Sequence, residues 1–273
     1  MTTWVNGALV ADEAAVVSAY DHGLTVGDGV FETLKVVGGV PFAMRRHVER
    51  LARSARALGL PEPDAGQVRE AVGAVVAADG RDRLRLRITY TGGIAPLGSG
   101  RGDSDPTLVV AVSGLAPWPA TTAVATVPWT RNERGALAGL KTTSYADNVI
   151  ALAAAHAVGA EEAVFADTRG RLSEGTGSNV FLVVDGRLLT PTLATGCLAG
   201  VTRALLLEWT DAVEEDIPFE ALGTAEEVFL TSSTRDVQAV HAVDDHRVPA
   251  APGPVTVEVA TTFERRSREN PDP

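Results

Sequence analysis

The chain has 273 residues, of which 45% are hydrophobic and 22% charged, a composition typical of a globular protein with a sizeable core. Its formal net charge of −11 argues against nucleic acid or an anionic membrane surface as a partner, because both recognise basic surfaces. This net charge is still compatible with a local basic pocket that binds a small anion. The single cysteine, Cys197, rules out an intrachain disulfide, and no apolar run has the roughly 18 residues of a membrane helix. We therefore expect a cytoplasmic enzyme or binding protein.

The first expected element of note is a strand that enters a hairpin. The stretch VFETLKVV (30–37) alternates as a strand does, and the glycine pair at 38–39 predicts a tight turn after it. One face of this strand is expected to carry Phe31, Thr33, Lys35 and Val37, and the other Glu32, Leu34 and Val36.

Two helices and two strands are expected next. Apolar residues recur at helical spacing in RRHVERLARSARALGL (45–60), and Asp64 is placed to cap a second helix. Alternation then predicts strands at 83–91 and 107–113. Between them lies the Gly-rich loop GGIAPLGSGRGDSD (92–105), and loops of that length are usually functional or mobile.

A proline-rich segment suggests a division of the chain. The stretch LAPWPA (115–120) has two prolines in six residues and is the candidate linker. We expect an N-terminal α+β domain at 1–116, a linker at 117–121 and a C-terminal domain at 122–273. The fold class is therefore α+β or α/β in two parts.

The C-terminal half is predicted to alternate short strands with helices. The expected strands are TAVATV, EAVFA, NVFLVV and EVFLTSS. Helices are expected at 145–158, 201–210 and about 255–268, and the tail NPDP is expected to fray. Strands this short and interrupted do not predict a regular barrel.

Lysine is rare in this chain, because the 24 Lys plus Arg include only Lys35 and Lys141. Lys141 stands in the polar run KTTS, just before the helix that Ser144 is expected to cap. In a partly dry pocket, a lysine can lose its proton and form a Schiff base with an aldehyde. A solvated lysine at a helix entrance is the alternative, and Lys35 is the only competing amine.

Two Gly-rich turns carry candidate binding groups. Glu174 lies in RLSEGTGSNVFLVVDG (171–186), beside Asn179. A carboxylate held there can keep a basic ring nitrogen protonated, or else the glycines and Asn179 only shape a hairpin. The turn GCLAGVTRALLLE (196–208) begins a helix with Thr202 in its first turn, which predicts either a phosphate site or an ordinary helix start.

Hydroxyl side chains gather where a strand ends in FLTSSTRDV, at Ser232, Ser233 and Thr234. This pattern is typical of an anion-binding nest. Arg50, on the first long helix, either supplies a bidentate guanidinium to the same phosphate or is merely solvated. An amine, a carboxylate for a ring nitrogen and several phosphate donors together match one cofactor, pyridoxal 5′-phosphate.

The sequence resembles the class IV aminotransferases, which are fold-type IV pyridoxal-phosphate enzymes. The family comprises branched-chain aminotransferases, D-amino-acid aminotransferases, (R)-amine transaminases and 4-amino-4-deoxychorismate lyase. Six motifs carry the resemblance in order along nearly the whole chain: DHGLTVGDGVFET (21–33), HVERL (47–51), GLKTTSYADN (139–148), LSEGTGSNVFLV (172–183), GCLAGVTR (196–203) and LTSSTRDV (230–237). The resemblance implies a two-domain fold of the D-amino-acid aminotransferase type, with a C-terminal domain that binds pyridoxal phosphate.

The resemblance also implies a role for each matching residue. Lys141 carries the internal aldimine and moves the proton between the substrate Cα and the cofactor C4′. Glu174 pairs with the pyridine nitrogen, so that the ring stays an electron sink. Leu198 packs on the ring face opposite the lysine, and Asn179 lies near the ring oxygen. The positions that match phosphate-binding residues are Arg50, Val201, Thr202, Ser233 and Thr234.

On the substrate side, the resemblance points Phe31 and Thr33 into the pocket. Arg134, seven residues before Lys141, matches an arginine near the family's active site. Lys35 is either a substrate-side cation or a strand-edge residue. Family members are homodimers that act on a small amino donor and a 2-oxo acid, and the partner's N-terminal domain contributes a loop to the active site between the domains. No His, Cys and carboxylate set has metal spacing, so no metal is expected.

The motifs leave the reaction open, because fold and cofactor do not decide it. VGDGVFETLK resembles the D-amino-acid enzymes, whereas Thr33 and Lys35 depart from the YGxxVFEGxR-like stretch of branched-chain enzymes. D-amino-acid aminotransferases bind the substrate carboxylate with an Arg and a His of the loop after the third strand. Here Leu97 and Ser99 stand at about those places, so the usual carboxylate trap is missing unless Arg101 or Lys35 replaces it.

We therefore expect a transaminase that transfers an amino group from a D-amino acid or (R)-amine to a 2-oxo acid through a Lys141 aldimine. The first alternative is 4-amino-4-deoxychorismate lyase, which eliminates pyruvate to give 4-aminobenzoate and has a similar GDG motif and Gly-rich loop. Branched-chain transamination is the second. A non-enzymatic carrier of the cofactor is disfavoured, because Lys141 and Glu174 are both retained.

Overall fold

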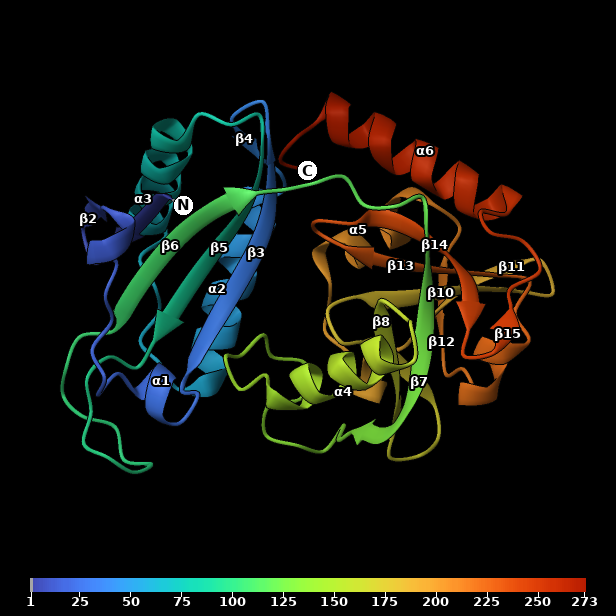
Figure 1. Cartoon of the computed structure of the whole chain (residues 1–273), viewed down its shortest axis with the longest axis horizontal. Helices are drawn as coiled ribbons and strands as arrows, with labels where there is room; N and C mark the ends of the chain where they lie inside the picture. The colour runs from blue at the N-terminus through green and yellow to red at the C-terminus, as the bar shows by residue number, and fades with distance from the viewer. Residues whose placement is uncertain (1) are drawn as a thin grey trace. The chain divides into compact units, whose positions relative to one another are not determined.

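The chain folds as two units, which the computed structural model describes over residues 2–273 (Figure 1). Unit 1 comprises Met1–Ala116, Leu140–Tyr145 and Asn270–Pro273, and unit 2 comprises Pro117–Gly139 and Ala146–Glu269. Each unit combines a sheet with packed helices, so the expected architecture of mixed α and β in two parts is confirmed. The sequence-based boundaries of 1–116, 117–121 and 122–273 stay a prediction.

Unit 1 is a six-stranded antiparallel sheet in the order β2-β1-β6-β5-β3-β4. Its strands are β1 (Thr2–Val5), β2 (Ala8–Val10), β3 (Gly29–Val37), β4 (Val40–Pro41), β5 (Arg83–Thr91) and β6 (Thr107–Gly114). Its helices are η1 (Asp12–Ala14), α1 (His22–Thr25), α2 (Met44–Leu58) and α3 (Ala65–Asp79). Helix α2 packs on β3, and α3 packs on β6 and β1.

Local sequence explains where these elements turn and end. Gly38 and Gly39 have φ angles of +57° and +77°, the left-handed values that the tight hairpin between β3 and β4 requires. The Asp64 carboxylate accepts a hydrogen bond from the Gln67 amide at 2.8 Å and so caps α3, as predicted. Gly59 ends α2 with a φ of +78°.

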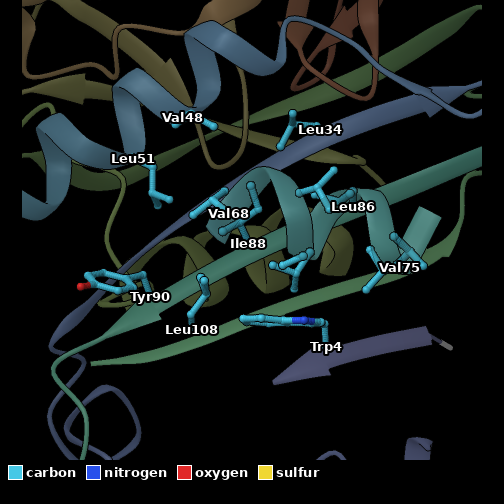
Figure 2. Packing of buried hydrophobic residues seen from close by; sticks show 14 of the residues in the cluster. Trp4, Leu34, Val48, Leu51, Val68, Val75, Leu86, Ile88, Tyr90 and Leu108 are labelled. Carbon is cyan, nitrogen blue, oxygen red and sulfur yellow. The ribbon is translucent and has the colours of Figure 1, made fainter. Parts of the chain in front are cut away.

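The core of unit 1 lies between its sheet and helices α2 and α3. Figure 2 shows side chains of this core: Trp4, Leu34, Val48, Leu51, Val68, Val75, Leu86, Ile88, Tyr90 and Leu108. Leu34, Leu86 and Ile88 are 0% exposed. Because successive strand residues point to opposite faces, this packing turns Thr33 and Lys35 away from the helices. The predicted assignment of the two faces of β3 is confirmed.

Residues Leu140–Tyr145 fold with unit 1, although they follow a strand of unit 2 in the sequence. The Phe31 amide donates to the Lys141 carbonyl at 3.0 Å, and the Thr143 amide donates to the Gly29 carbonyl at 2.8 Å. The segment thus pairs with the start of β3. This backbone pairing fixes the position of Lys141 against the strand that carries Phe31.

The expectation that Ser144 caps the following helix is wrong. Helix α4 (Ala146–Ala157) begins two residues later, and the Ser144 hydroxyl donates to the Gly27 carbonyl at 3.1 Å. A Cβ at Gly27 would lie 2.6 Å from the same hydroxyl oxygen, so only glycine fits there. Ser144 therefore closes the loop before β3.

The expectation of a frayed tail is also wrong. The Ala43 amide donates to the Pro271 carbonyl at 2.7 Å, and the Arg45 amide donates to Asp272 Oδ1 at 2.9 Å. Ala43 stands at the N-cap of α2 and has no side chain that can cap the helix. Residues 270–273 therefore supply the cap that the local sequence lacks.

Unit 2 is a nine-stranded mixed sheet in the order β12-β11-β10-β13-β14-β7-β8-β9, with β15 paired to β14. Its strands are β7 (Thr121–Arg131), β8 (Glu162–Asp167), β9 (Leu172–Gly175), β10 (Asn179–Val184), β11 (Arg187–Pro191), β12 (Val213–Glu215), β13 (Glu227–Ser232), β14 (Asp236–Val243) and β15 (His246–Arg247). Its helices are α4, η2 (Leu193–Thr195), α5 (Val201–Trp209), η3 (Phe219–Gly223) and α6 (Pro254–Glu269). The sheet curls, because β9 at one end of the order contacts β10.

The two faces of this sheet have separate cores. Val164 of β8 belongs to one core, whereas Ala163 and Phe165 pack with α4 on the other face. Helices α5 and α6 pack against β13, and Phe181 and Phe229 stack with ring centroids 5.0 Å apart. Among residues 2–273, no helix combines the length and the apolar character needed to cross a membrane.

Candidate active site

The Lys141 side chain lies among aromatic rings in unit 1. Its Nζ is 4.3 Å from the centroid of the Phe31 ring, and Tyr145 meets that ring edge to face at 5.4 Å. The Arg87 guanidinium carbon lies 3.8 Å from the same centroid. Lys141 is half-buried. The Lys141 amine and the Arg87 guanidinium thus both lie against the Phe31 ring, and both groups can bind an anionic ligand.

The sheet face that carries Phe31 is basic. In the antiparallel register of β3 and β5, Thr33 lies opposite Arg87 and Lys35 lies opposite Arg85. Lys35 is 8% exposed, and its Nζ lies 4.7 Å from the centroid of the Phe42 ring. Desolvation lowers the pKa of Arg87 from its ordinary value. The sequence analysis assigned no role to these arginines, although their alternation in RLRLRITYT places them all on one face.

Arg50 is part of a buried cluster in unit 1. Its Nε and Nη2 donate to the two oxygens of Glu32 at 2.8 and 2.7 Å, and His47 Nδ1 lies 2.6 Å from Glu32 Oε2. Burial raises the pKa of Glu32, but Arg50 and His47 outweigh it and hold this pKa well below its usual range. Burial lowers the pKa of His47, with Arg50 and Lys141 acting in the same direction against Glu32. The role of Arg50 at a phosphate stays a prediction.

In unit 2, Glu174 is brought together with Leu198 and Asn179. Glu174 Oε2 accepts from the Leu198 amide at 2.9 Å, and Asn179 Nδ2 donates to the Leu198 carbonyl, also at 2.9 Å. A Cβ at Gly200 would lie 2.0 Å from Asn179 Oδ1, so this close approach requires glycine. Three predicted cofactor residues, which come from two of the motifs, therefore form one group.

Arg131 is a member of this group that the sequence analysis missed. Its Nε lies 3.1 Å from Glu174 Oε1, and its Nη1 donates to Asn148 Oδ1 at 2.7 Å. The guanidinium also packs 4.0 Å from the centroid of the Phe165 ring. Because Glu174 is far from Arg131 in the sequence, no local pattern predicted this contact. The structure does not place Arg134 in this group: its side chain is 74% exposed and lies 3.7 Å from Glu133 Oε1.

The predicted phosphate residues of unit 2 lie on a helix start and a hairpin turn. Gly200, the N-cap of α5, provides no side-chain cap, and Thr202 Oγ1 is buried with no hydrogen-bond partner among the described residues. Ser233 and Thr234 lie in the turn between β13 and β14 and are half-buried. A buried, unsatisfied hydroxyl at the start of a helix fits an anion such as phosphate.

These features fit a fold-type IV pyridoxal-phosphate enzyme. The family model described as Amino-transferase class IV matches residues 29–243. The chain belongs to the class IV aminotransferases, and its cofactor is pyridoxal 5′-phosphate, as expected. Its substrates are accordingly amino and keto acids.

Relatives within the family differ in activity. The chain is 32% identical to a putative branched-chain-amino-acid aminotransferase of Methanocaldococcus jannaschii, over 89% of this chain and 88% of that one. It is 31% identical to the bifunctional aminodeoxychorismate lyase / D-amino acid transaminase of Mycobacterium tuberculosis, over 92% and 94%. The structure is similar to that of the branched-chain aminotransferase of Thermoproteus uzoniensis with norvaline, with a TM-score of 0.91, 28% identity and coverage of 97% and 94%. The predicted fold type is confirmed.

Proposed function

We propose that this enzyme transfers an amino group from a D-amino acid or an (R)-amine to a 2-oxo acid. The observation that carries the proposal is the setting of Lys141, whose Nζ and the Arg87 guanidinium both lie against the Phe31 ring. Bound pyridoxal phosphate supplies an aldehyde for the amine and an electron sink for the reaction. Lys141 would hold the aldehyde and move the proton at the substrate Cα, and Arg87 would attract the substrate carboxylate beside it.

In unit 2, Glu174 takes the role of the carboxylate that keeps a ring nitrogen protonated. Arg131 and the Leu198 amide hold both of its oxygens in place, which supports a fixed orientation. Thr202, with Val201 through its backbone, and the turn with Ser233 and Thr234 are the proposed phosphate donors, and Asn179 and Leu198 are the proposed ring contacts. Arg50 is a proposed phosphate contact from unit 1.

The substrate carboxylate needs a partner other than the loop arginine. The Arg101 guanidinium is committed to Asp28 and to the carbonyls of Leu58 and Gly59. This leaves Lys35 and Arg87, on the Phe31 face of β3 and β5, as the proposed carboxylate binders.

The lyase is the second candidate function. It is supported by the resemblance of the GDG motif and the Gly-rich loop, and by the relative named both as aminodeoxychorismate lyase and as D-amino acid transaminase. Branched-chain transamination, supported by the names of two of the relatives above, is third. A homodimer is proposed from the family resemblance, and a cytoplasmic location from the single, unpaired Cys197.

A substrate panel tests the proposal. D-alanine or an (R)-amine should convert the bound cofactor to its pyridoxamine form, read from the absorption spectrum, and a 2-oxo acid should reverse the change. Conversion only with L-leucine or L-valine would favour branched-chain transamination. Pyruvate release from 4-amino-4-deoxychorismate, without any amino acceptor, would establish the lyase. Light scattering after size-exclusion chromatography tests the dimer.

A further inference from the structure

A single buried carboxylate in unit 2 ties together three segments that are far apart in the sequence. Glu162 Oε1, at the start of β8, accepts from the Thr176 amide at 3.0 Å and from the Thr176 hydroxyl. Its Oε2 accepts from Ser178 Oγ at 3.2 Å and from Arg235 Nη2 at 3.0 Å. The Glu162 and Arg235 side chains are 2% and 8% exposed. Such a pair is a rigid link, because each buried charge is satisfied by several partners.

Arg235 is also held in place by contacts other than the one with Glu162. Its Nη1 donates to Gln238 Oε1 at 2.8 Å, and its guanidinium packs 4.2 Å from the centroid of a Trp118 ring. The Arg235 amide donates to Ser232 Oγ at 3.2 Å, which closes the short turn between β13 and β14. The turn that contains Ser233 and Thr234 therefore ends at Arg235, whose side chain these contacts fix.

The other end of the link is the turn between β9 and β10. Thr176 and Ser178 lie in this turn, which Glu174 precedes and Asn179 follows. A Cβ at Gly175 would lie 2.3 Å from Ser178 Oγ, so the turn packs around the Glu162 carboxylate with no room for a larger residue. The Glu162–Arg235 pair thus connects the turn that contains Ser233 and Thr234 to the backbone beside Glu174.

We propose that Glu162 and Arg235 are positioning residues that hold the phosphate turn at Ser233 and Thr234 in a fixed place relative to the turn that directly follows Glu174 and β9. The proposal rests on the proposed cofactor residues of unit 2. The phosphate of pyridoxal phosphate is joined to its rigid ring by a short arm, so the partners of the phosphate and of the ring nitrogen need a well-defined separation. Neither residue needs to touch the cofactor for this role.

The two residues should have different effects when changed. In Arg235→Gln, Glu162 keeps Thr176 and Ser178, so only the phosphate turn is released. This variant should bind pyridoxal phosphate at least about tenfold more weakly, with affinity for pyridoxal, which lacks the phosphate, changed by less than about threefold. In Glu162→Gln, both turns lose their charged anchor, and affinity for both ligands should fall.

Dissociation constants of the two ligands, measured on the cofactor-free full chain by fluorescence titration below the unfolding temperature, give the test. Arg187→Gln removes an exposed ion pair of the same unit, with Glu215 at 2.7 Å, and should change neither constant. If Arg235→Gln does not fold, Arg235→Lys keeps the charge but not the planar fork and should show the same selective loss in smaller size.

Two results would overturn the positioning role: unchanged affinity for pyridoxal phosphate in the Arg235 variant, or equal proportional losses for both ligands, which a general loss of structure would cause. A wild-type enzyme that binds pyridoxal and pyridoxal phosphate equally well would refute the phosphate site itself. That outcome would overturn the proposal through the proposed function rather than through the Arg235 anchor.

Discussion

Arg101 donates hydrogen bonds to both carboxylate oxygens of Asp28, from Nη2 to Oδ1 at 2.6 Å and from Nε to Oδ2 at 2.7 Å. The same guanidinium donates to the Leu58 and Gly59 carbonyls at 2.7 Å each. One side chain therefore fastens the Gly-rich loop at 92–105 both to the segment before β3 and to the end of α2. These hydrogen bonds hold the long loop in place, and Arg101 therefore stabilises the fold.

His22 should make the stability of this anchor depend on pH. Its Nδ1 lies 2.7 Å from Asp28 Oδ2 and its Nε2 lies 3.0 Å from the Gly98 carbonyl, so both nitrogens face acceptors and the protonated ring fits best. The hydrogen bond with Asp28, and then that with Gly98, raise the pKa of His22 above its ordinary value of 6.5. A raised folded pKa stabilises the fold below the unfolded pKa, and this stabilisation is lost as pH rises through the folded pKa.

Urea unfolding of the wild type and of His22→Gln, between about pH 6 and pH 9, measures this contribution. The difference in the free energy of unfolding should shrink as the pH rises. A difference that stays constant or grows would show that His22 is neutral in the folded protein.

Lys141 should be the lysine that carries the cofactor. Borohydride reduction followed by peptide mass mapping should place the pyridoxyl label on Lys141, and Lys141→Ala should lower turnover by at least about 10²–10⁴-fold, the usual contribution of a general acid–base group. Lys35→Ala is the matched control and should keep the label. A label on Lys35 would contradict the assignment.

Glu174→Gln should retain the cofactor and slow the amino-donor half-reaction by about 10²-fold, because a neutral ring is a weaker electron sink. Stopped-flow absorption of the half-reaction measures the rate, and the absorption spectrum confirms that the cofactor is bound. Glu215→Gln, an exposed change in the same unit, should leave the rate unaltered. Equal rates in the wild type and Glu174→Gln would remove the proposed role.

Arg50→Ala should destabilise the apo-protein by about 3–5 kcal/mol, because Glu32 would be left charged and buried at 0% exposure. The double variant Glu32→Gln with Arg50→Met should recover most of that loss. It should still bind pyridoxal phosphate about 1.5–3 kcal/mol more weakly, if Arg50 contacts the phosphate. Urea unfolding and ligand titration separate the two effects. Full cofactor affinity in the double variant would show that Arg50 stabilises the fold and does not bind the phosphate.

Asp272→Ala should cost about 1 kcal/mol of stability, because its carboxylate caps α2 through the Arg45 amide. Thermal or urea unfolding measures the change. Asp211→Ala, at an exposed position of unit 2, is the control and should have little effect. Equal stabilities of the wild type and Asp272→Ala would mean that the tail adds nothing to the helix start.

Local patterns in the sequence determined the elements of this protein and the chemistry of its cofactor. The alternation in VFETLKVV, the Asp64 cap and the lysine of KTTS each depend on neighbouring residues, so they can be recognised without a fold. The tertiary structure alone decided which distant groups meet: Arg131 with Glu174, Glu162 with Arg235, and Leu140–Tyr145 with β3. Such pairings are set by sheet order and by the burial of charge, and no pattern of neighbouring residues encodes them.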